Sequence, residues 1–374
     1  MKVAILETVK ATAGFELEYD RIIIETLKKL GHEPIMLLPE KTDLGRDFGV
    51  PISYLPGGEI VSYEGAGKLK KIWLSLLREG RRVNWFDACI DAIEKEKIEA
   101  VLITTATYRY LRALKKSKLR NSPVPIKFMF LGVNPGEKPK FFDKAKACTG
   151  FKNIQLFITT LRDDFGKELP ENTRLILPPV MVPESCLRQD LHEPMKIGFF
   201  GHYRQGDKNL DLIFSAIESC SFKRDVQFVV QLVPTTDKDR EDVDAIVNKY
   251  QGNEKISFIT RALIGDDWYN GIQSVDVVFL PYTAERYLYN WSAIYFTAIG
   301  CYKPVLTTST LNPEVMQEFD VGEIVNLNEA AVFSKQLEGF VNDFADKNVH
   351  YQKQLKLANR KYSKEGFIKT LLKG

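Results

Sequence analysis

Short apolar runs alternate with longer amphipathic runs along almost the whole chain, and this alternation constrains the fold more than any other feature. The short runs have the length of buried strands, and the longer runs repeat apolar residues at the spacing of a helix face. A strand followed by a helix and a further strand favours a parallel sheet with helices on both faces. The sequence therefore predicts an α/β protein.

The expected elements fall into two series, separated by residues 178–195, where four prolines lie among polar residues. This composition is typical of a linker, and 374 residues suffice for two domains. We expect two Rossmann-like domains, residues 1–180 and 181–350, facing a cleft that holds the ligand at the carboxyl ends of the strands. Residues 351–374 are expected to form a C-terminal helix.

In the first series, strands are expected at residues 3–6, 34–38, 100–104, 126–131 and 154–158, and helices at 16–30, 66–77, 86–97 and 108–119. Turn signals in residues 40–66 indicate an irregular excursion. In the second series, strands are expected at residues 195–200, 226–232, 256–259, 276–280, 304–307 and 323–325. The matching helices are expected at residues 208–219, 240–250, 266–272, 291–300 and 329–344, with a polar helical tail at 349–372.

Cysteine and histidine usage argues against a metal centre. The five cysteines are scattered without CxxC spacing, and the four histidines show no ligand spacing either. The adjacent pairs Asp163-Asp164 and Asp266-Asp267 have two interpretations, metal carboxylates or the first residues of helices. We expect helix N-termini, with no metal and no cofactor.

No apolar run is long enough to span a bilayer, and the first residues do not resemble a secretion signal, so a cytoplasmic protein is expected. Charge is uneven: residues 1–182 contain 30 Lys and Arg against 23 Asp and Glu, whereas the remainder is net negative. This distribution argues against a nucleic-acid partner. The basic segments 68–82 and 108–120 are either solvated helix faces or a peripheral contact with an anionic membrane. The sequence is compatible with a monomer or with a homodimer.

Residues 280–304 combine the end of a strand, a polar loop and a helix start. We expect Asn290 to cap this helix and Gly300 to end it, which leaves the amides of Trp291 and Ser292 open to an anion. Tyrosine hydroxyls in the same stretch are candidates to contact the bound ligand, and packing is the alternative for each of them: Tyr282, Tyr287, Tyr289 and Tyr295. The Asn290 side chain is a candidate partner for a sugar hydroxyl.

The loop after the strand 195–200 carries a second candidate site. Gly201 and His202 precede Arg204 and Lys208, whose cationic groups would clamp a diphosphate leaving group. The alternative is an ordinary solvated loop. A small-residue loop at residues 11–15 includes Gly14, which allows a ligand to approach the backbone, although the GxGxxG fingerprint is missing.

The second half resembles the retaining GT-B glycosyltransferases of family 4 (group 1). The resemblance rests on the Phe200-Gly201-His202 and Lys208-Asn209-Leu210 segments, on the run from Ser274 to Pro281, and on the small-residue segment Ala298-Ile299-Gly300 before Pro304-Val305. His202 departs from the arginine that is usual in the family, and Arg204 is a candidate replacement. The resemblance covers residues 175–330.

A further departure concerns two glutamates that the family places eight positions apart. Tyr287 and Tyr295 stand at these positions, and Glu285 lies two residues before the first. The usual carboxylate contacts to donor sugar and ribose are therefore missing from the expected positions.

The resemblance implies a metal-independent, retaining transfer of a hexose from a nucleotide-diphosphate sugar to a glycan, protein or lipid acceptor. Arg204 and Lys208 would stabilise the leaving phosphate, and the loop with Arg261 would lie near the base. GDP-mannose is the first donor to test, and the C-terminal helix would pack back toward the first domain. A sugar-nucleotide epimerase and a non-catalytic nucleotide-sugar-binding protein are the alternatives.

Overall fold

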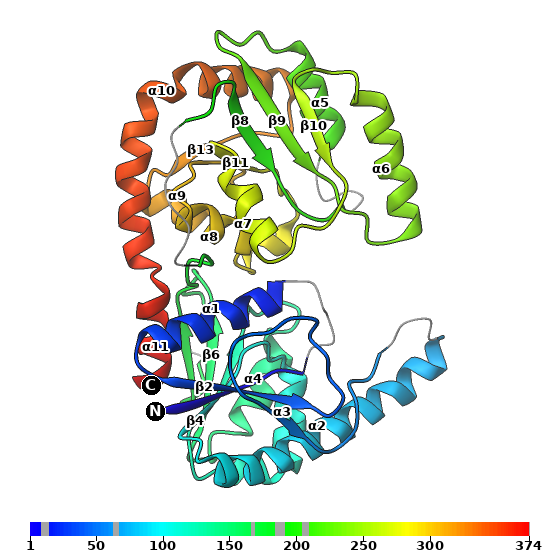
Figure 1. Ribbon diagram of the computed structural model, residues 1–374, viewed down its shortest axis with the longest axis vertical. Coiled ribbons are helices and arrows are strands. Elements are labelled where there is room, and N and C mark those ends of the chain that lie inside the picture. Colours follow the sequence, from blue (N-terminus) through cyan, green and yellow to red (C-terminus); the bar gives the residue numbers. More distant parts are fainter. Residues whose placement is uncertain (9–14, 63–66, 166–168, 184–190, 204–208, 374) are drawn as a thin grey trace. The chain divides into compact units, whose positions relative to one another are not determined.

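The computed structural model describes residues 1–8, 15–62, 67–165, 169–183, 191–203 and 209–373, and it divides into two compact units (Figure 1). The N-terminal unit comprises residues 1–178 and 364–374, and the C-terminal unit comprises residues 179–363. The chain therefore passes from one unit to the other at the first two prolines of the proline-rich segment.

The N-terminal unit is built on a seven-stranded parallel sheet with the order β3-β2-β1-β4-β5-β6-β7. Its strands are β1 (Lys2–Leu6), β2 (Glu33–Pro39), β3 (Ile52–Leu55), β4 (Ala100–Ile103), β5 (Ile126–Phe130), β6 (Ile154–Thr159) and β7 (Thr173–Ile176). Its helices are α1 (Phe15–Lys29), α2 (Lys68–Glu96), α3 (Tyr108–Lys116), the 3-10 turn η1 (Lys118–Asn121), α4 (Lys138–Lys146) and α11 (Lys364–Lys373).

All residues of β4 and β5 are buried, as expected for central strands whose two faces are both covered by helices. Ile5 of β1 lies between Met36 of β2 and Leu102 of β4 in the ladder. Large side chains of the long helix α2, Trp85 and Phe86, are fully buried in the core over this sheet. Burial of such aromatic and aliphatic surface is the main stabilising contribution in a unit of this size.

The C-terminal unit is built on a six-stranded parallel sheet with the order β10-β9-β8-β11-β12-β13. Its strands are β8 (Met195–Phe199), β9 (Val226–Gln231), β10 (Ile256–Ile259), β11 (Val277–Leu280), β12 (Val305–Thr307) and β13 (Gly322–Ile324). Its helices are α5 (Leu210–Ser219), α6 (Asp237–Tyr250), α7 (Asp266–Gln273), the 3-10 turn η3 (Glu285–Leu288), α8 (Ala293–Gly300), α9 (Pro313–Glu318) and α10 (Ala330–Lys361).

In both sheets, the direction in which successive strands are added reverses at the same place. The first strand of each unit lies beside the fourth, so the order reverses between β1 and β4 and again between β8 and β11. Loops at the carboxyl ends of the two strands that flank such a reversal diverge and leave room for a ligand. The parallel α/β architecture that the sequence predicts is confirmed in both units.

The helix that the sequence divides into 66–77 and 86–97 is a single helix, α2. Gly80, which lies between the two expected helices, continues the helix, and a side chain at its position would meet open space. Glycine inside a helix costs only about 1 kcal/mol relative to alanine, and the buried second half of α2 offsets this cost. The expected irregular excursion at residues 40–66 is also corrected, because it contains the edge strand β3, paired with β2.

The expected separate helices at 329–344 and 349–372 are arranged differently. The structure has one helix, α10, of 32 residues, followed by a break at Tyr362 and Ser363 and then by α11. α11 belongs to the N-terminal unit and packs on α1, where Lys29 pairs with Glu365 at 2.8 Å and the Tyr19 and Phe367 rings lie 6.2 Å apart. No helix among the described residues is both long and apolar enough to cross a membrane.

Candidate donor site at the carboxyl edge of the C-terminal sheet

The loops that follow β8 and β11 flank the reversal of strand order in the C-terminal unit. Gly201, two residues after β8, has a φ of 128°, which a residue with a side chain rarely adopts. The Tyr282 hydroxyl, in the loop after β11, donates to the Phe200 carbonyl at 3.2 Å. The two loops are therefore tied together at the point where a ligand is expected in this topology.

Gln231, the last residue of β9, connects two of the loops. Its side chain is 2% exposed, its Oε1 accepts from the Gly201 amide at 3.0 Å, and its Nε2 donates to the Arg261 carbonyl at 3.0 Å. One buried side-chain amide thus joins the loop after β8 to the loop after β10. Our sequence analysis missed this residue; its signal is a polar side chain that ends an otherwise apolar strand.

Arg261 follows β10 and reaches the first turn of α7. Its guanidinium contacts Asp267 at 3.0 Å, and the side chains are 68% and 57% exposed. An ion pair this exposed contributes about 0–1 kcal/mol, so exchanging Asp267 for a ligand group would cost little. His202 is exposed and forms an isolated parallel bridge with Val233, two residues after the end of β9.

The tyrosine-rich segment folds over the end of β11. Tyr282 and Tyr287 form a tilted ring pair with centroids 4.8 Å apart, and Tyr287 lies in η3. Tyr289 and Asn290 are half-buried just after this turn. The loop after β11 therefore carries one packed tyrosine pair and two partly accessible polar side chains.

The start of α8 differs from the expectation. Asn290 is not the N-cap; the helix begins at Ala293 and Ser292 caps it, with its Oγ accepting from the Tyr295 amide at 3.4 Å. The Ser292 amide itself donates to Asn312 Oδ1 at 2.8 Å. The expected open amide at Ser292 is thus already paired. The reason is tertiary: a side chain from a distant loop accepts the hydrogen bond that the local sequence left open for an anion.

That side chain belongs to Asn312, which lies just before Pro313 and caps α9. Asn312 is 2% exposed, has a left-handed φ of 45° that asparagine tolerates well, and also donates its Nδ2 to the Asn290 carbonyl at 3.3 Å. Asn312 therefore holds the cap residue Ser292 and, two residues before it, Asn290. Our sequence analysis missed it as well, although an asparagine in front of a proline is a recognisable turn signal.

Two of the aromatic candidates lie inside the C-terminal unit. Trp291 is 8% exposed, and its ring stands perpendicular to the Phe296 ring at 5.6 Å. Tyr295 is fully buried, and this burial raises the pKa of its hydroxyl, which stays protonated. Both side chains pack inside the C-terminal unit.

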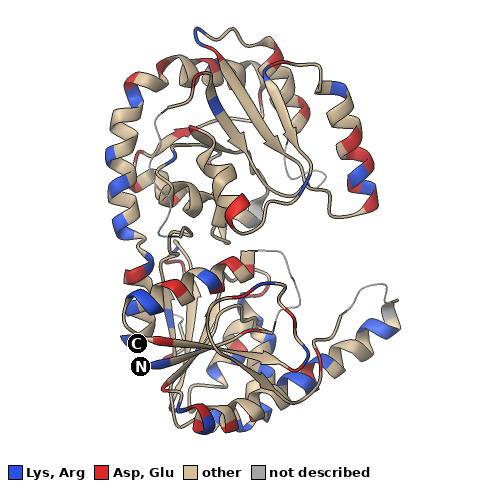
Figure 2. Ribbon diagram, viewed as in Figure 1, with Lys and Arg blue, Asp and Glu red and all other residues tan. Residues whose placement is uncertain are grey.

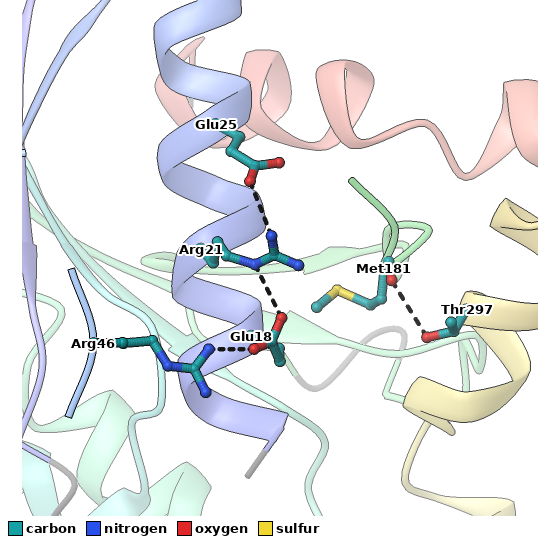
Figure 3. A network of polar contacts seen from close by, with 6 residues as sticks. All are labelled: Glu18, Arg21, Glu25, Arg46, Met181 and Thr297. Atoms are coloured by element: carbon teal, nitrogen blue, oxygen red, sulfur yellow. Dashed lines mark hydrogen bonds and ion pairs between the residues drawn. The ribbon is translucent and has the colours of Figure 1, made fainter. Parts of the chain in front are cut away.

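α8 ends at Gly300, as the sequence predicts, although the left-handed residue after the helix is Tyr302, with a φ of 56°. A side chain at Gly300 would come within 2.6 Å of Val182. This glycine is therefore needed for the close approach of α8 to the first residues of the unit, where Thr297 also donates its hydroxyl to the Met181 carbonyl at 3.3 Å (Figure 3).

Three of the expected site residues lie outside the described residues: Gly14, Arg204 and Lys208. The side chain of Glu285 is likewise outside them. Among the residues that the structure does describe, no three His, Cys, Asp or Glu side chains gather as they would to hold a metal ion.

A polar cluster that the sequence analysis did not select lies at the equivalent edge of the N-terminal sheet. Glu7 directly follows β1, Thr104 and Thr105 directly follow β4, and Asp20 comes from α1. Thr104 Oγ1 donates to Asp20 at 2.6 Å, Thr105 Oγ1 donates to Glu7 at 3.1 Å, and both carboxyl groups are buried. Glu7 was recognisable as an acidic residue that ends an apolar strand.

Burial first, and then the nearby charge of Glu7, raise the pKa of Asp20 well above its usual range. Two buried carboxyl groups that face each other hold a proton more tightly than either would alone. Chemically, this edge can store a proton and accept hydrogen bonds. Nearby on α1, Glu18 is bound by Arg46 and, at 3.0 Å, by Arg21, which also reaches Glu25 at 3.4 Å (Figure 3).

No family model matches the chain, and a search of curated proteins found no match. Solved structures do match it over its full length. HepE of Anabaena, in complex with UDP and glucose, has a TM-score of 0.66 at 12% identity, covering 100% of this chain and 98% of that chain. A glycosyltransferase from Rickettsia africae has a TM-score of 0.63 at 12% identity, with coverages of 100% and 97%.

A third match is the E. coli structure described as trehalose-6-phosphate bound with UDP-2-fluoro glucose. Its TM-score is 0.67 at 10% identity, and the match covers 100% of this chain and 98% of that chain. At such identities the likeness shows the fold alone. The chain thus has the GT-B fold, two parallel-sheet α/β domains, that the sequence resemblance implied.

Proposed function

We propose that this protein is a glycosyltransferase that binds a nucleotide-diphosphate sugar at the carboxyl edge of its C-terminal sheet. The observation that carries the proposal is the set of loops after β8, β10 and β11, held at the reversal of strand order by Gln231 and Tyr282. Prearranged loops at this place suit a ligand with several polar groups. The GT-B fold is consistent with this use.

The proposed donor is a UDP-sugar or GDP-mannose. Structures of Anabaena HepE hold UDP or UDP-glucose, and the E. coli match holds UDP-2-fluoro glucose, which favours uracil as the first base to test. GDP-mannose, the donor suggested by the sequence resemblance, is the direct competitor. Arg261, whose guanidinium is exposed beside the loop that Gln231 holds, is the proposed neighbour of the base.

The proposed mechanism uses charge rather than a metal ion. In this mechanism Arg204 and Lys208 stabilise the negative charge that develops on the leaving diphosphate, and the transferred hexose keeps its anomeric configuration. The acceptor is a glycan, a protein or a lipid. The family's two glutamates contact the donor sugar and ribose and not the diphosphate, so Tyr287 and Tyr295 at these positions leave the proposed clamp by Arg204 and Lys208 unaffected.

Calorimetric titration with UDP-glucose, UDP-N-acetylglucosamine, GDP-mannose, UDP and GDP, with and without EDTA, tests the donor site. We expect one sugar nucleotide to bind equally well with EDTA present, and Lys208→Ala to weaken this binding while Lys208→Arg keeps most of it. Lys238→Ala, an exposed lysine on α6, is the matched control. Absence of binding across the panel, or equal loss in the control, would contradict the proposed site.

A specific observation favours a second candidate function, nucleotide-sugar binding without turnover. One of the two positions at which the family has glutamates is occupied by Tyr295, which is fully buried. Product formation separates the two functions. A transferase releases more than one nucleotide per protein molecule when donor and acceptor extracts are supplied, whereas a binding protein retains the donor unchanged.

A further inference from the structure

The first turns of α2 carry a row of apolar side chains that the protein does not bury. Leu69, Ile72, Trp73 and Leu76 are 85%, 63%, 60% and 64% exposed. Their spacing of three and four residues places them on one face of the helix. A sequence with this spacing predicts a face packed against a core, and the structure instead leaves this face, the apolar stripe, in solvent.

The opposite side of the same turns is attached to the N-terminal unit. Leu74 is buried and packs with Val61 and Leu77. In Figure 1 these turns of α2 extend past the other helices of the N-terminal unit. The stripe is therefore held outward by packing on the other side of the helix.

Cationic side chains lie on the helices around the stripe. On α2 itself the exposed Lys70 lies beside Trp73, three residues further on, whereas Lys71 is exposed on the far side of the helix, and residues 67–78 contain no Asp or Glu. One turn after Leu76, Glu79 is bound by Lys116 of α3 at 2.7 Å and also by Arg112. These pairs bring α3 alongside the end of the stripe.

The adjoining segment of α3 and η1 adds further positive charge. Residues 108–120 contain six Lys and Arg and no Asp or Glu, and all six side chains are exposed. Figure 2 shows Lys and Arg in blue along α2. The single acidic residue at the junction, Glu79, is already neutralised by its two partners.

This combination suits one kind of occupant. An apolar helix face that includes a tryptophan enters the boundary between head groups and acyl chains, while lysine and arginine beside it bind anionic head groups. A second copy of the chain fits less well, because a symmetric contact through the stripe would bring Lys70 and the cations of α3 from both copies together. The charge around the stripe thus selects a negatively charged partner.

We propose that the apolar stripe of α2, together with the exposed cations of α2 and α3, docks this protein on the surface of an anionic phospholipid bilayer. The protein lies on the membrane and does not span it. Trp73 sits at the interface, with Leu69, Ile72 and Leu76 beneath the head groups. This docking stands apart from the proposed donor site, which lies on the C-terminal unit.

Vesicle co-sedimentation of the full-length protein tests the proposal without any nucleotide sugar. The probes are vesicles of phosphatidylcholine alone and vesicles of phosphatidylcholine mixed with phosphatidylglycerol. We expect binding to the mixed vesicles only, and weaker binding at higher salt, because the Debye length shortens. Equal binding to both vesicles, or binding to neither, would overturn the proposal.

Two variants separate the apolar and ionic contributions. Leu69→Gln with Trp73→Gln is expected to reduce partition by about 100-fold, because two large apolar side chains no longer leave water. Lys70→Gln with Lys71→Gln is expected to reduce it by about 25-fold, at about fivefold for each cation. All four residues are exposed, so the melting temperature should not change.

The C-terminal unit supplies matched controls on α10. Val349→Gln with Leu357→Gln removes two exposed apolar side chains, and Lys353→Gln with Lys356→Gln removes two exposed lysines. Both controls should bind mixed vesicles as the natural protein does. If the stripe variant converts a dimer into a monomer in sedimentation while vesicle binding stays the same, the stripe is an interface between two copies and the proposal is wrong.

Discussion

The first six strands of each sheet have the same order and the same reversal of that order, yet the polar groups at the carboxyl edges of the two sheets differ. In the C-terminal unit, uncharged amides of Gln231 and Asn312 hold the loops. In the N-terminal unit, the buried carboxyl groups of Glu7 and Asp20 occupy the equivalent edge and bind threonine hydroxyls. An amide keeps its hydrogen bonds at every physiological pH, whereas a buried carboxyl pair changes with its protons.

This difference indicates separate tasks for the two edges. Loops that must keep one geometry for a polar ligand are well served by side chains that never titrate. An edge with a stored proton is suited to a step, or to a conformational equilibrium, that depends on protonation. The following variants test whether the two edges behave as differently as their chemistry predicts.

The largest effect is expected for Gln231→Leu. The substitution leaves the Gly201 amide and the Arg261 carbonyl without their buried partner, which should lower the free energy of unfolding by about 3 kcal/mol. Denaturant unfolding at pH 5 and pH 8 should give the same loss, because no titrating group is involved. Gln227→Leu, half-buried on the same strand, is the control. If the loss in the free energy of unfolding depended on pH, the two edges would not differ in the way proposed.

Asn312→Gly comes next, with an expected loss of about 2 kcal/mol, because the two hydrogen bonds to the Asn290–Ser292 segment disappear. Glycine accepts the left-handed φ of this position, so the change reports on the side chain and not on backbone strain. Thermal unfolding measures the loss. Affinity for the sugar nucleotide should fall too, and an unchanged affinity would show that the start of α8 does not take part in binding.

Asp20→Asn should change the pH dependence of stability. The pKa of Asp20 is raised in the folded protein, so at a pH above its unfolded value the folded chain keeps a proton that the unfolded chain has lost. The free energy of unfolding should therefore fall as the pH rises toward the folded pKa, by about 1.4 kcal/mol per pH unit. In the variant this slope should be reduced.

Urea unfolding at a series of pH values from 5 to 7 would measure the slope. Asp91→Asn, an exposed residue of α2, is the control and should leave the slope unchanged. The same slope in the natural protein and in Asp20→Asn would mean that the carboxyl pair is not the proton store, and the contrast between the two edges would then fail.

The smallest effect on stability is expected for Arg261→Gln. The ion pair with Asp267 is exposed, so its loss should change the free energy of unfolding by less than about 1 kcal/mol. If Arg261 contacts the base of the donor, calorimetry should nevertheless show roughly tenfold weaker binding of the sugar nucleotide. Lys249→Gln, whose pair with Asp211 on α6 and α5 is likewise exposed, is the control. Weakened binding in both variants would point to general charge and not to Arg261.

The periodicity of the chain was sufficient to predict the type of fold. Apolar runs such as 226–232 and 276–280 are strands in the structure, and the helices between them return the chain to a parallel neighbour. Local signals were weaker at boundaries: two helices were expected where the structure has the single helix α2, and the turn signals of residues 40–66 concealed β3. In α2, packing of the second half outweighs the cost of about 1 kcal/mol that Gly80 carries inside a helix.

The candidate site was only partly predictable. The sequence pointed to the loops after β8, β10 and β11, because the end of a strand and the polar residues that follow it are adjacent in the chain. It misplaced the cap of α8, since the partner of the Ser292 amide, Asn312, lies 20 residues further along the chain.

By itself, then, the sequence determined a two-domain parallel α/β protein and the loops that lie at the carboxyl edges of its sheets. Both follow from short-range periodicity, which each segment carries within itself. Only the tertiary structure decided that Gln231 joins Gly201 to Arg261, that Glu7 meets Asp20, and that the apolar stripe of α2 faces solvent. These outcomes depend on which distant segments of the chain contact each other. Strand order and helix packing determine those contacts, and they involve residues far apart in the sequence.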